Sequence, residues 1–150
     1  MDFFTEIDID GAQAEAIARG LFAVARADGV HERELALIAS FYGDAGAVGG
    51  GRSLADLERR EPITPAELAA ALPGAEHRKL FLKTAILLAW IDNVVTDAER
   101  VCIGGYATAL GVSKEELDRL EDGVKDFLLA QLSHLKNTDA TRKVAGDLKL

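Results

Sequence analysis

The chain has 150 residues, of which 49% are apolar and 28% are charged, and its formal charge is −8. This length and balance are typical of one soluble globular domain with a substantial core. The acidic balance disfavours a general nucleic-acid-binding protein, because such a protein needs a basic face to neutralise phosphates. The only cysteine, Cys102, excludes an intrachain disulfide and agrees with a reducing cytoplasm.

No segment predicts export or membrane insertion. The opening MDFFTEIDID contains neither a basic segment nor a long apolar run, so we expect no signal peptide. The longest strongly apolar stretch, residues 80–91, is interrupted by Lys83 and is shorter than the ~20 residues that a transmembrane helix needs. We therefore expect a cytoplasmic protein with no membrane insertion.

Apolar residues at helical spacing predict two helices at the start of the chain. Residues 12–26 and 32–42 both repeat apolar side chains at intervals of three and four, which gives each segment one apolar face. Asp10 is well placed to cap the first of these helices. The glycine-rich segment AGAVGGGRS, residues 45–53, predicts a loop.

Two short helices are expected next. Residues 53–56 (SLAD) and 64–67 (TPAE) both carry helix-start chemistry, the second with proline at the first helical position. After the Pro73-Gly74 turn, residues 75–91 are apolar on nearly all sides, which predicts a central buried helix.

A further helix is predicted over residues 97–110, ended by Gly111. Ser113 then opens the last long helix, residues 114–135. Its predicted inner face consists of Leu117, Leu120, Val124, Phe127, Leu128 and Leu132. From Asn137 the chain is polar and weakly patterned, which leaves a short helix or a disordered tail open.

Together these elements predict an all-α fold, a single-domain bundle of six to seven helices. The domain would cover residues 1–136, with a polar C-terminal tail or short helix over residues 137–150. The bundle would contain an internal near-repeat of helix, acidic loop and helix.

That near-repeat is the most informative motif. Its copies are LFAVARADGVHERELALIASF, residues 21–41, and AILLAWIDNVVTDAERVCIGGYA, residues 85–107. In both, an apolar run ends in Asp-Gly or Asp-Asn, and acidic residues precede the next apolar run. Asp28 and Asp92 are 64 residues apart, so each half of the chain carries one loop. If apposed, the loops would gather five or six carboxylates, an arrangement that suits calcium or magnesium.

Helix capping explains part of this acidity. Thr96 and Glu99 form the pattern of a capping box, and acids in a first turn also interact favourably with the helix macrodipole. Asp28 and Asp92 are different, because each lies at the end of the preceding helix, where the macrodipole disfavours a carboxylate. A bound cation would offset that cost, and so would a hydrogen-bonded turn that uses the aspartate side chain.

The candidate metal ligands are therefore the acids of the two loops. A cation would bridge Asp28 with Glu32 or Glu34 in the first loop, and Asp92 with Asp97 or Glu99 in the second.

Catalytic motifs are not found. The sequence contains no HExxH pair, no phosphate-binding P-loop and no nucleophile elbow. His31, His77 and His134 lie far apart in the sequence. Nothing supports an enzyme or an organic cofactor.

The segments ADGVHERE and IDNVVTDAE resemble the paired motifs of the tellurite-resistance TerB-like domains, over about residues 12–120. In this chain the acid falls six residues after the aspartate in the first loop (Glu34) and seven after it in the second (Glu99), and the family shows the same asymmetry. The resemblance implies a helical bundle with a divalent-metal site between the loops and the six ligands named above. Asn93 replaces the usual glycine, and Ala98 is neutral where an acid often stands.

The resemblance also implies a stress-response or membrane-associated signalling role rather than catalysis. Two hypotheses follow. The protein is a cation-responsive interaction module, or it is a metal-free helical scaffold whose acidic loops only cap helices. Either implies a protein partner, and peripheral association with a membrane complex and the oligomeric state are left open.

Overall fold

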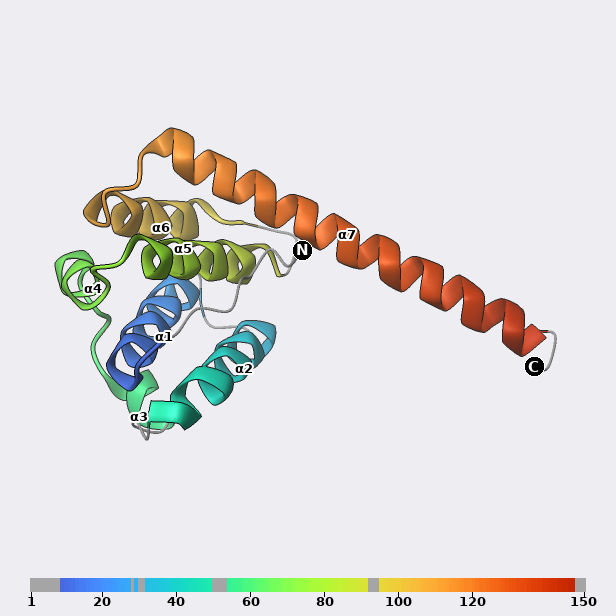
Figure 1. The fold of residues 1–150 in the computed structure, drawn as a ribbon, viewed down its shortest axis with the longest axis horizontal. Helices are drawn as coiled ribbons and strands as arrows, with labels where there is room; N and C mark the ends of the chain where they lie inside the picture. The colour runs from blue at the N-terminus through green and yellow to red at the C-terminus, as the bar shows by residue number, and fades with distance from the viewer. Residues whose placement is uncertain (1–8, 28, 30–31, 50–53, 92–94, 148–150) are drawn as a thin grey trace.

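The computed structural model describes residues 9–27, 29, 32–49, 54–91 and 95–147, with side chains for all of these except 43–49 and 132–147. The described residues form seven helices and no strand (Figure 1). In chain order the helices are α1 (Gly11–Arg26), α2 (Glu32–Gly49), α3 (Leu54–Arg59), α4 (Pro65–Ala71), α5 (Ala75–Trp90), α6 (Asp97–Ala109) and α7 (Lys114–Asp147). The predicted all-α fold is confirmed.

Helix α1 is the hub of the bundle and contacts α2, α3, α4, α5 and α6. The predicted cap at Asp10 is confirmed: Asp10 Oδ1 accepts from the backbone N–H of Gln13 at 2.7 Å, and Gln13 Oε1 accepts from that of Asp10 at 3.2 Å. A Cβ atom at Gly20 would lie 2.5 Å from the Phe81 ring of α5. Glycine at this position therefore allows α1 and α5 to pack closely.

Helix α5 is the second core helix. Its buried residues occupy most sides of the helix, as predicted, and are Leu80, Phe81, Leu82, Thr84, Ala85, Ile86, Leu88 and Ala89. The Phe81 ring meets that of Tyr106 from α6 edge to face, with ring centroids 5.4 Å apart. Truncating a buried phenylalanine to alanine costs about 3–5 kcal/mol, so the burial of Phe81 contributes strongly to the stability of the bundle.

Helix α2 is longer than predicted. It continues to Gly49, so the predicted loop was wrong for residues 45–49, while residues 50–53 lie outside the described residues. Alanine is the best helix former, and one glycine costs only about 1 kcal/mol relative to it. Single glycines separated by alanine and valine were therefore weaker helix breakers than the prediction assumed.

The two predicted short helices, α3 and α4, lie between α2 and α5 in the chain. Helix α4 starts with a complete capping box: Thr64 Oγ1 accepts from the Glu67 N–H at 3.1 Å, and Glu67 Oε1 accepts from the Thr64 N–H at 3.3 Å. At its other end, the Arg78 guanidinium donates to the carbonyl of Leu72, and also to that of Leu110 at the end of α6. Backbone groups at two helix ends are thus satisfied by one side chain.

Helix α6 ends as predicted at Gly111, whose φ of +75° is the left-handed value that favours glycine. The Gly111 N–H donates to the Thr108 carbonyl at 3.1 Å, and the Val112 N–H to the Ala107 carbonyl at 2.9 Å. This pair of bonds is a Schellman motif, which ends the helix and turns the chain toward α7.

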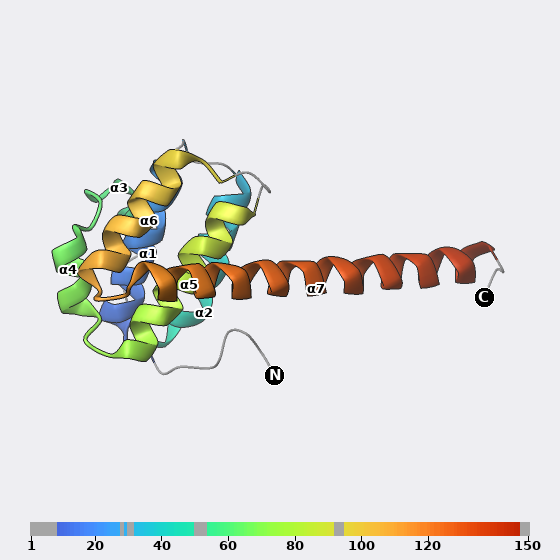
Figure 2. The ribbon, with the colours of Figure 1, turned by 90° about the horizontal axis from the view of Figure 1, so that it is seen from above.

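Helix α7 packs on α5 and α6 with its N-terminal part and then projects away from the body (Figures 1 and 2). Ser113 Oγ accepts from the Glu116 N–H at 3.2 Å, in agreement with the predicted start. Of the predicted inner face, Val124 is fully buried, and Leu117, Leu120 and Leu128 pack against the core. The helix does not end near residue 135 but continues through Asn137 to Asp147.

No helix in the described part of the chain is both long enough and apolar enough to cross a membrane.

Candidate metal centre

The first acidic segment joins α1 to α2. Gly29 has a φ of +81°, which supports the predicted turn. Helix α2 then begins with an exposed acid, Glu32, and a buried one, Glu34, which is 2% exposed. Asp28 lies outside the described residues.

The second acidic segment joins α5 to α6, and its predicted capping box is confirmed. Thr96 Oγ1 accepts from the Glu99 N–H at 3.2 Å. Glu99 Oε1 accepts from the Thr96 N–H at 3.1 Å and from the Thr96 hydroxyl at 3.2 Å. Glu99 is 3% exposed, whereas Asp97 is exposed. Asp92 lies outside the described residues.

The two segments place their acids at matching helix positions. Glu32 and Asp97 are the first residues of α2 and α6, and Glu34 and Glu99 are the third. In each helix the acid at the first position is exposed and the acid at the third position is buried. The one-residue difference in spacing between the two segments therefore lies in the loops, because the acids hold the same positions in the helices.

The helix ends that flank the two segments lie at one end of the bundle. Figure 2 shows α5 ending near the beginnings of α2 and α6. Helix α5 also contacts both α2 and α6. Within the described ranges, however, no three Asp, Glu, His or Cys residues form a group that could hold a metal ion. The predicted ligand set depends on Asp28 and Asp92 and stays a prediction.

The half-buried thiol of Cys102 lies one turn after Glu99. Burial, and secondly the charge of Glu99, raise the pKa of the Cys102 thiol above its ordinary value. The thiolate is the nucleophilic form, so this cysteine is a poor nucleophile at neutral pH. This environment favours a structural role for Cys102.

A groove of about 470 Å³ lies beside the second acidic segment, between α5, α6 and α7. Trp90 and Glu121, which line the groove, both contact Lys125: its ammonium lies 5.0 Å from the centroid of the Trp90 ring and 3.5 Å from a carboxylate oxygen of Glu121. Glu121 also pairs with Arg100 at 3.2 Å. Only the spacing of Glu121 and Lys125 by four residues could have indicated this network from the sequence, because its other contacts join different helices.

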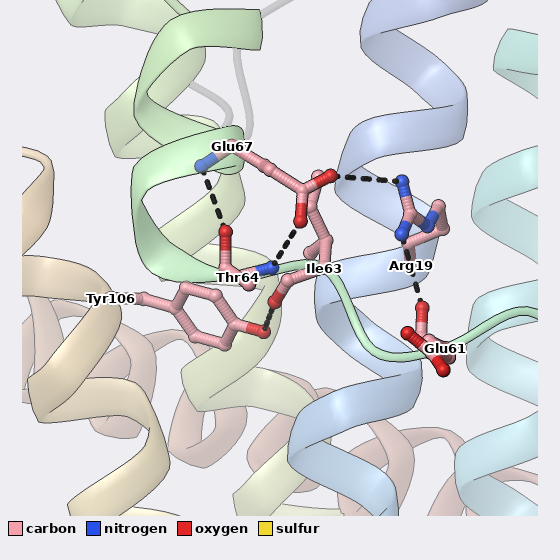
Figure 3. Close-up of polar contacts among 6 residues, drawn as sticks. All are labelled: Arg19, Glu61, Ile63, Thr64, Glu67 and Tyr106. Atoms are coloured by element: carbon pink, nitrogen blue, oxygen red, sulfur yellow. Dashed lines mark hydrogen bonds and ion pairs between the residues drawn. The ribbon is translucent and has the colours of Figure 1, made fainter.

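A separate polar cluster joins α1, the start of α4 and α6 (Figure 3). The Tyr106 hydroxyl donates to the Ile63 carbonyl at 2.6 Å, and burial raises the pKa of Tyr106. Arg19 donates to the Glu61 carbonyl at 3.0 Å and lies 3.9 Å from Glu67. These contacts hold the segment before α4 in place and suggest a structural role for the cluster.

Comparison with protein-family models, curated proteins and solved structures finds no significant match to this chain.

Proposed function

We propose that this protein is a non-enzymatic helical interaction module that binds one divalent cation, calcium or magnesium, between its two acidic segments. The observation that carries the proposal is the pair of buried glutamates, Glu34 and Glu99, at the third positions of α2 and α6. Carboxylate oxygens are the ligands that calcium and magnesium prefer. Two carboxylates held out of water at matching helix positions would therefore suit a cation shared between the two segments.

The capping box leaves ligand capacity at Glu99. Both hydrogen bonds that Thr96 donates to its carboxylate are accepted by Oε1, so Oε2 is the oxygen that would face a cation. Calcium takes six to eight oxygen ligands, more than two glutamates can provide. Asp28 and Asp92, together with the exposed Glu32 and Asp97, complete the proposed set of ligands.

A shared ion would couple the α1–α2 and α5–α6 helix pairs at one end of the bundle. It would thereby fix the position of α6 relative to α5. These two helices and α7 line the 470 Å³ groove. In this proposal the ion sets the shape that the groove presents to a protein partner. The resemblance of the acidic segments to TerB-like domains supports a stress-response setting in the cytoplasm.

A metal-free scaffold is the second candidate. Its support is the capping box of α4, where Thr64 and Glu67 form the same pair of hydrogen bonds as Thr96 and Glu99. Helix α4 follows neither acidic segment, so a glutamate at this helix position needs no metal site to explain it. In that case the acids of both segments serve helix initiation and solubility alone.

Thermal unfolding with calcium or magnesium, compared with EDTA, separates the two candidates. An ion that binds only the folded state at a hundred times its dissociation constant stabilises by about 2.7 kcal/mol. For a chain of this size we expect a rise in Tm of roughly 5–10 °C. The fluorescence of Trp90, the only tryptophan, should also change, because it ends α5 immediately before the second loop.

Glutamine substitutions provide matched variants. Glu34→Gln with Glu99→Gln should abolish the shift in Tm, as should Asp28→Ala with Asp92→Ala. Glu67→Gln is the control, because it changes the same helix position in α4. Gln13 already serves at the third position of α1, so glutamine is compatible with the capping box. An unchanged Tm of the wild type in millimolar ion would exclude the proposal and favour the scaffold.

A further inference from the structure

Helix α7 continues far beyond the body on which it packs. Its 34 residues span about 51 Å at ~1.5 Å per residue. Leu128 packs against the core, and the helix then runs on to Asp147 away from the other helices (Figures 1 and 2). Most of the stability of a helix in a protein comes from packing on other elements, so contact with a partner would stabilise the projecting part of α7.

One stripe of α7 carries charges that reverse at its midpoint. Residues at intervals of seven, nearly two helical turns, follow this stripe, which winds around a straight helix by only ~20° per interval. They are Glu115, Asp122, Leu129, Lys136 and Lys143. Glu115 and Asp122 are exposed, and Leu129 is 63% exposed. Val124, which is fully buried, comes two residues after Asp122, so the core contact lies on the opposite side of the helix.

The net charge of residues 114–150 also changes sign near the middle of α7. Residues 114–131 contain six acidic and three basic residues, a net charge of −3. Residues 132–150 contain four basic and two acidic residues, a net charge of +2 in a chain whose total is −8. The projecting end of α7 is thus the basic part of an acidic protein, and it complements the packed end of the same helix.

We propose that α7 pairs antiparallel with α7 of a second copy of this chain, with the two-fold axis at Leu129. This arrangement brings Leu129 against its equivalent and places Asp122 opposite Lys136 of the partner subunit. Glu115 then lies opposite Lys143 of the partner subunit, and the symmetry makes each pair occur twice. A parallel pair would instead place acid against acid and lysine against lysine, which is unfavourable.

The composition of the stripe determines the character of this dimer. Exposed ion pairs contribute ~0.2–1 kcal/mol each and are screened by salt, so the association is weak and salt-dependent. The body of each copy lies on the opposite side of its own α7, which leaves the stripe accessible to the other copy.

Sedimentation equilibrium of the full chain in EDTA tests the proposal independently of the cation site. At about 50 mM salt the mass should rise with concentration toward twice 16.0 kDa. The dissociation constant should increase roughly tenfold or more near 1 M salt. Lys136→Glu with Lys143→Glu should weaken the dimer by a similar factor, and so should Glu115→Lys with Asp122→Lys. An equimolar mixture of these two double variants should restore association.

Arg59→Glu with Arg60→Glu is the matched control, because it makes the same change in net charge at two exposed residues of the body. This variant should dimerise like the wild type, and circular dichroism should show that all variants are folded. The proposal is wrong if the wild type stays monomeric at roughly 0.1 mM and low salt, a result that would leave α7 for a different partner. It is equally wrong if the lysine double variant dimerises as well as the wild type, because only an antiparallel pair opposes these lysines to acids.

Discussion

Helices α4 and α6 begin with the same chemistry but in different surroundings. Thr64 and Glu67 form one capping box and Thr96 and Glu99 the other, with backbone-to-side-chain distances of 3.1–3.3 Å in both. The side chain of Glu67 is 54% exposed, whereas Glu99 is 3% exposed. Capping therefore explains why each helix starts with a glutamate at its third position, but it does not explain why one of the two is buried.

The start of α2 resembles α6 in this respect. Glu34 is also the third residue of its helix and is 2% exposed. The two helices that follow the acidic segments thus share buried glutamates, and α4, which follows no such segment, does not. This difference is the physical basis for proposing a cation at α2 and α6.

Removing the two capping hydroxyls should have the largest effect on stability and should differ between the helices. Thr64→Ala should cost about 1 kcal/mol and Thr96→Ala about 2 kcal/mol, the upper part of the range for such caps. The larger loss is expected because the Thr96 hydroxyl also donates to the buried carboxylate of Glu99. Urea unfolding measures both values, and equal losses would mean that burial adds nothing to the cap of α6.

Tyr106→Phe tests the link between the two helices, because Tyr106 of α6 bonds the carbonyl of Ile63 immediately before α4. The buried Ile63 carbonyl would lose its partner, at a cost of about 1–1.5 kcal/mol. Burial raises the pKa of Tyr106 above its ordinary 10.0. The unfolded chain therefore loses this proton first, so wild-type stability falls as the pH rises above 10.0, and the phenylalanine variant should lack that contribution. Parallel stability-pH curves for the two proteins would contradict this assignment.

Glu67→Gln and Glu99→Gln should have smaller effects in EDTA. Hydrogen bonding to the backbone and side chain of Thr64 lowers the pKa of Glu67. Its contribution is therefore present at neutral pH and is lost as the pH falls through the lowered pKa, so Glu67→Gln should flatten the acid limb slightly. Glu99→Gln removes the cost of a buried charge but weakens the two hydrogen bonds that Thr96 donates to Oε1, so we expect a net change within about 1 kcal/mol. A destabilisation well above about 1 kcal/mol by Glu99→Gln in EDTA would show that the protein stabilises the charge of Glu99 without a cation.

The smallest expected effect concerns the reactivity of Cys102. Its thiol should react more slowly with iodoacetamide near pH 8 than a free cysteine does, because burial raises its pKa. Glu99 adds to that rise, so Glu99→Gln should accelerate the reaction modestly, while Glu67→Gln should leave the rate unchanged. Identical rates in both variants would contradict the electrostatic contribution of Glu99.

Local chemistry could be predicted from the sequence, and tertiary burial could not. The caps at Asp10, Thr64 and Thr96 follow from residue types three positions apart, and all were predicted. The burial of Glu34 and Glu99 depends on how α2 and α6 pack on other helices, and no local pattern encodes it.

The errors in helix length have a similar cause. Residues 45–49 were predicted as a loop from their glycines, yet α2 includes them. The segment after Asn137 has weak periodicity because it projects beyond the core, and it is helical as the continuation of α7. Periodicity reports which residues pack on a core, so it underestimates helices that extend past one.

Calorimetric titration of calcium and magnesium into the EDTA-treated, dialysed protein tests the central claim most directly. The cation proposal predicts saturable binding of one ion per chain, which is lost in Glu34→Gln with Glu99→Gln and retained in Glu67→Gln. No binding by the wild type at millimolar ion, or equal binding by the Glu34/Glu99 double variant, would contradict it.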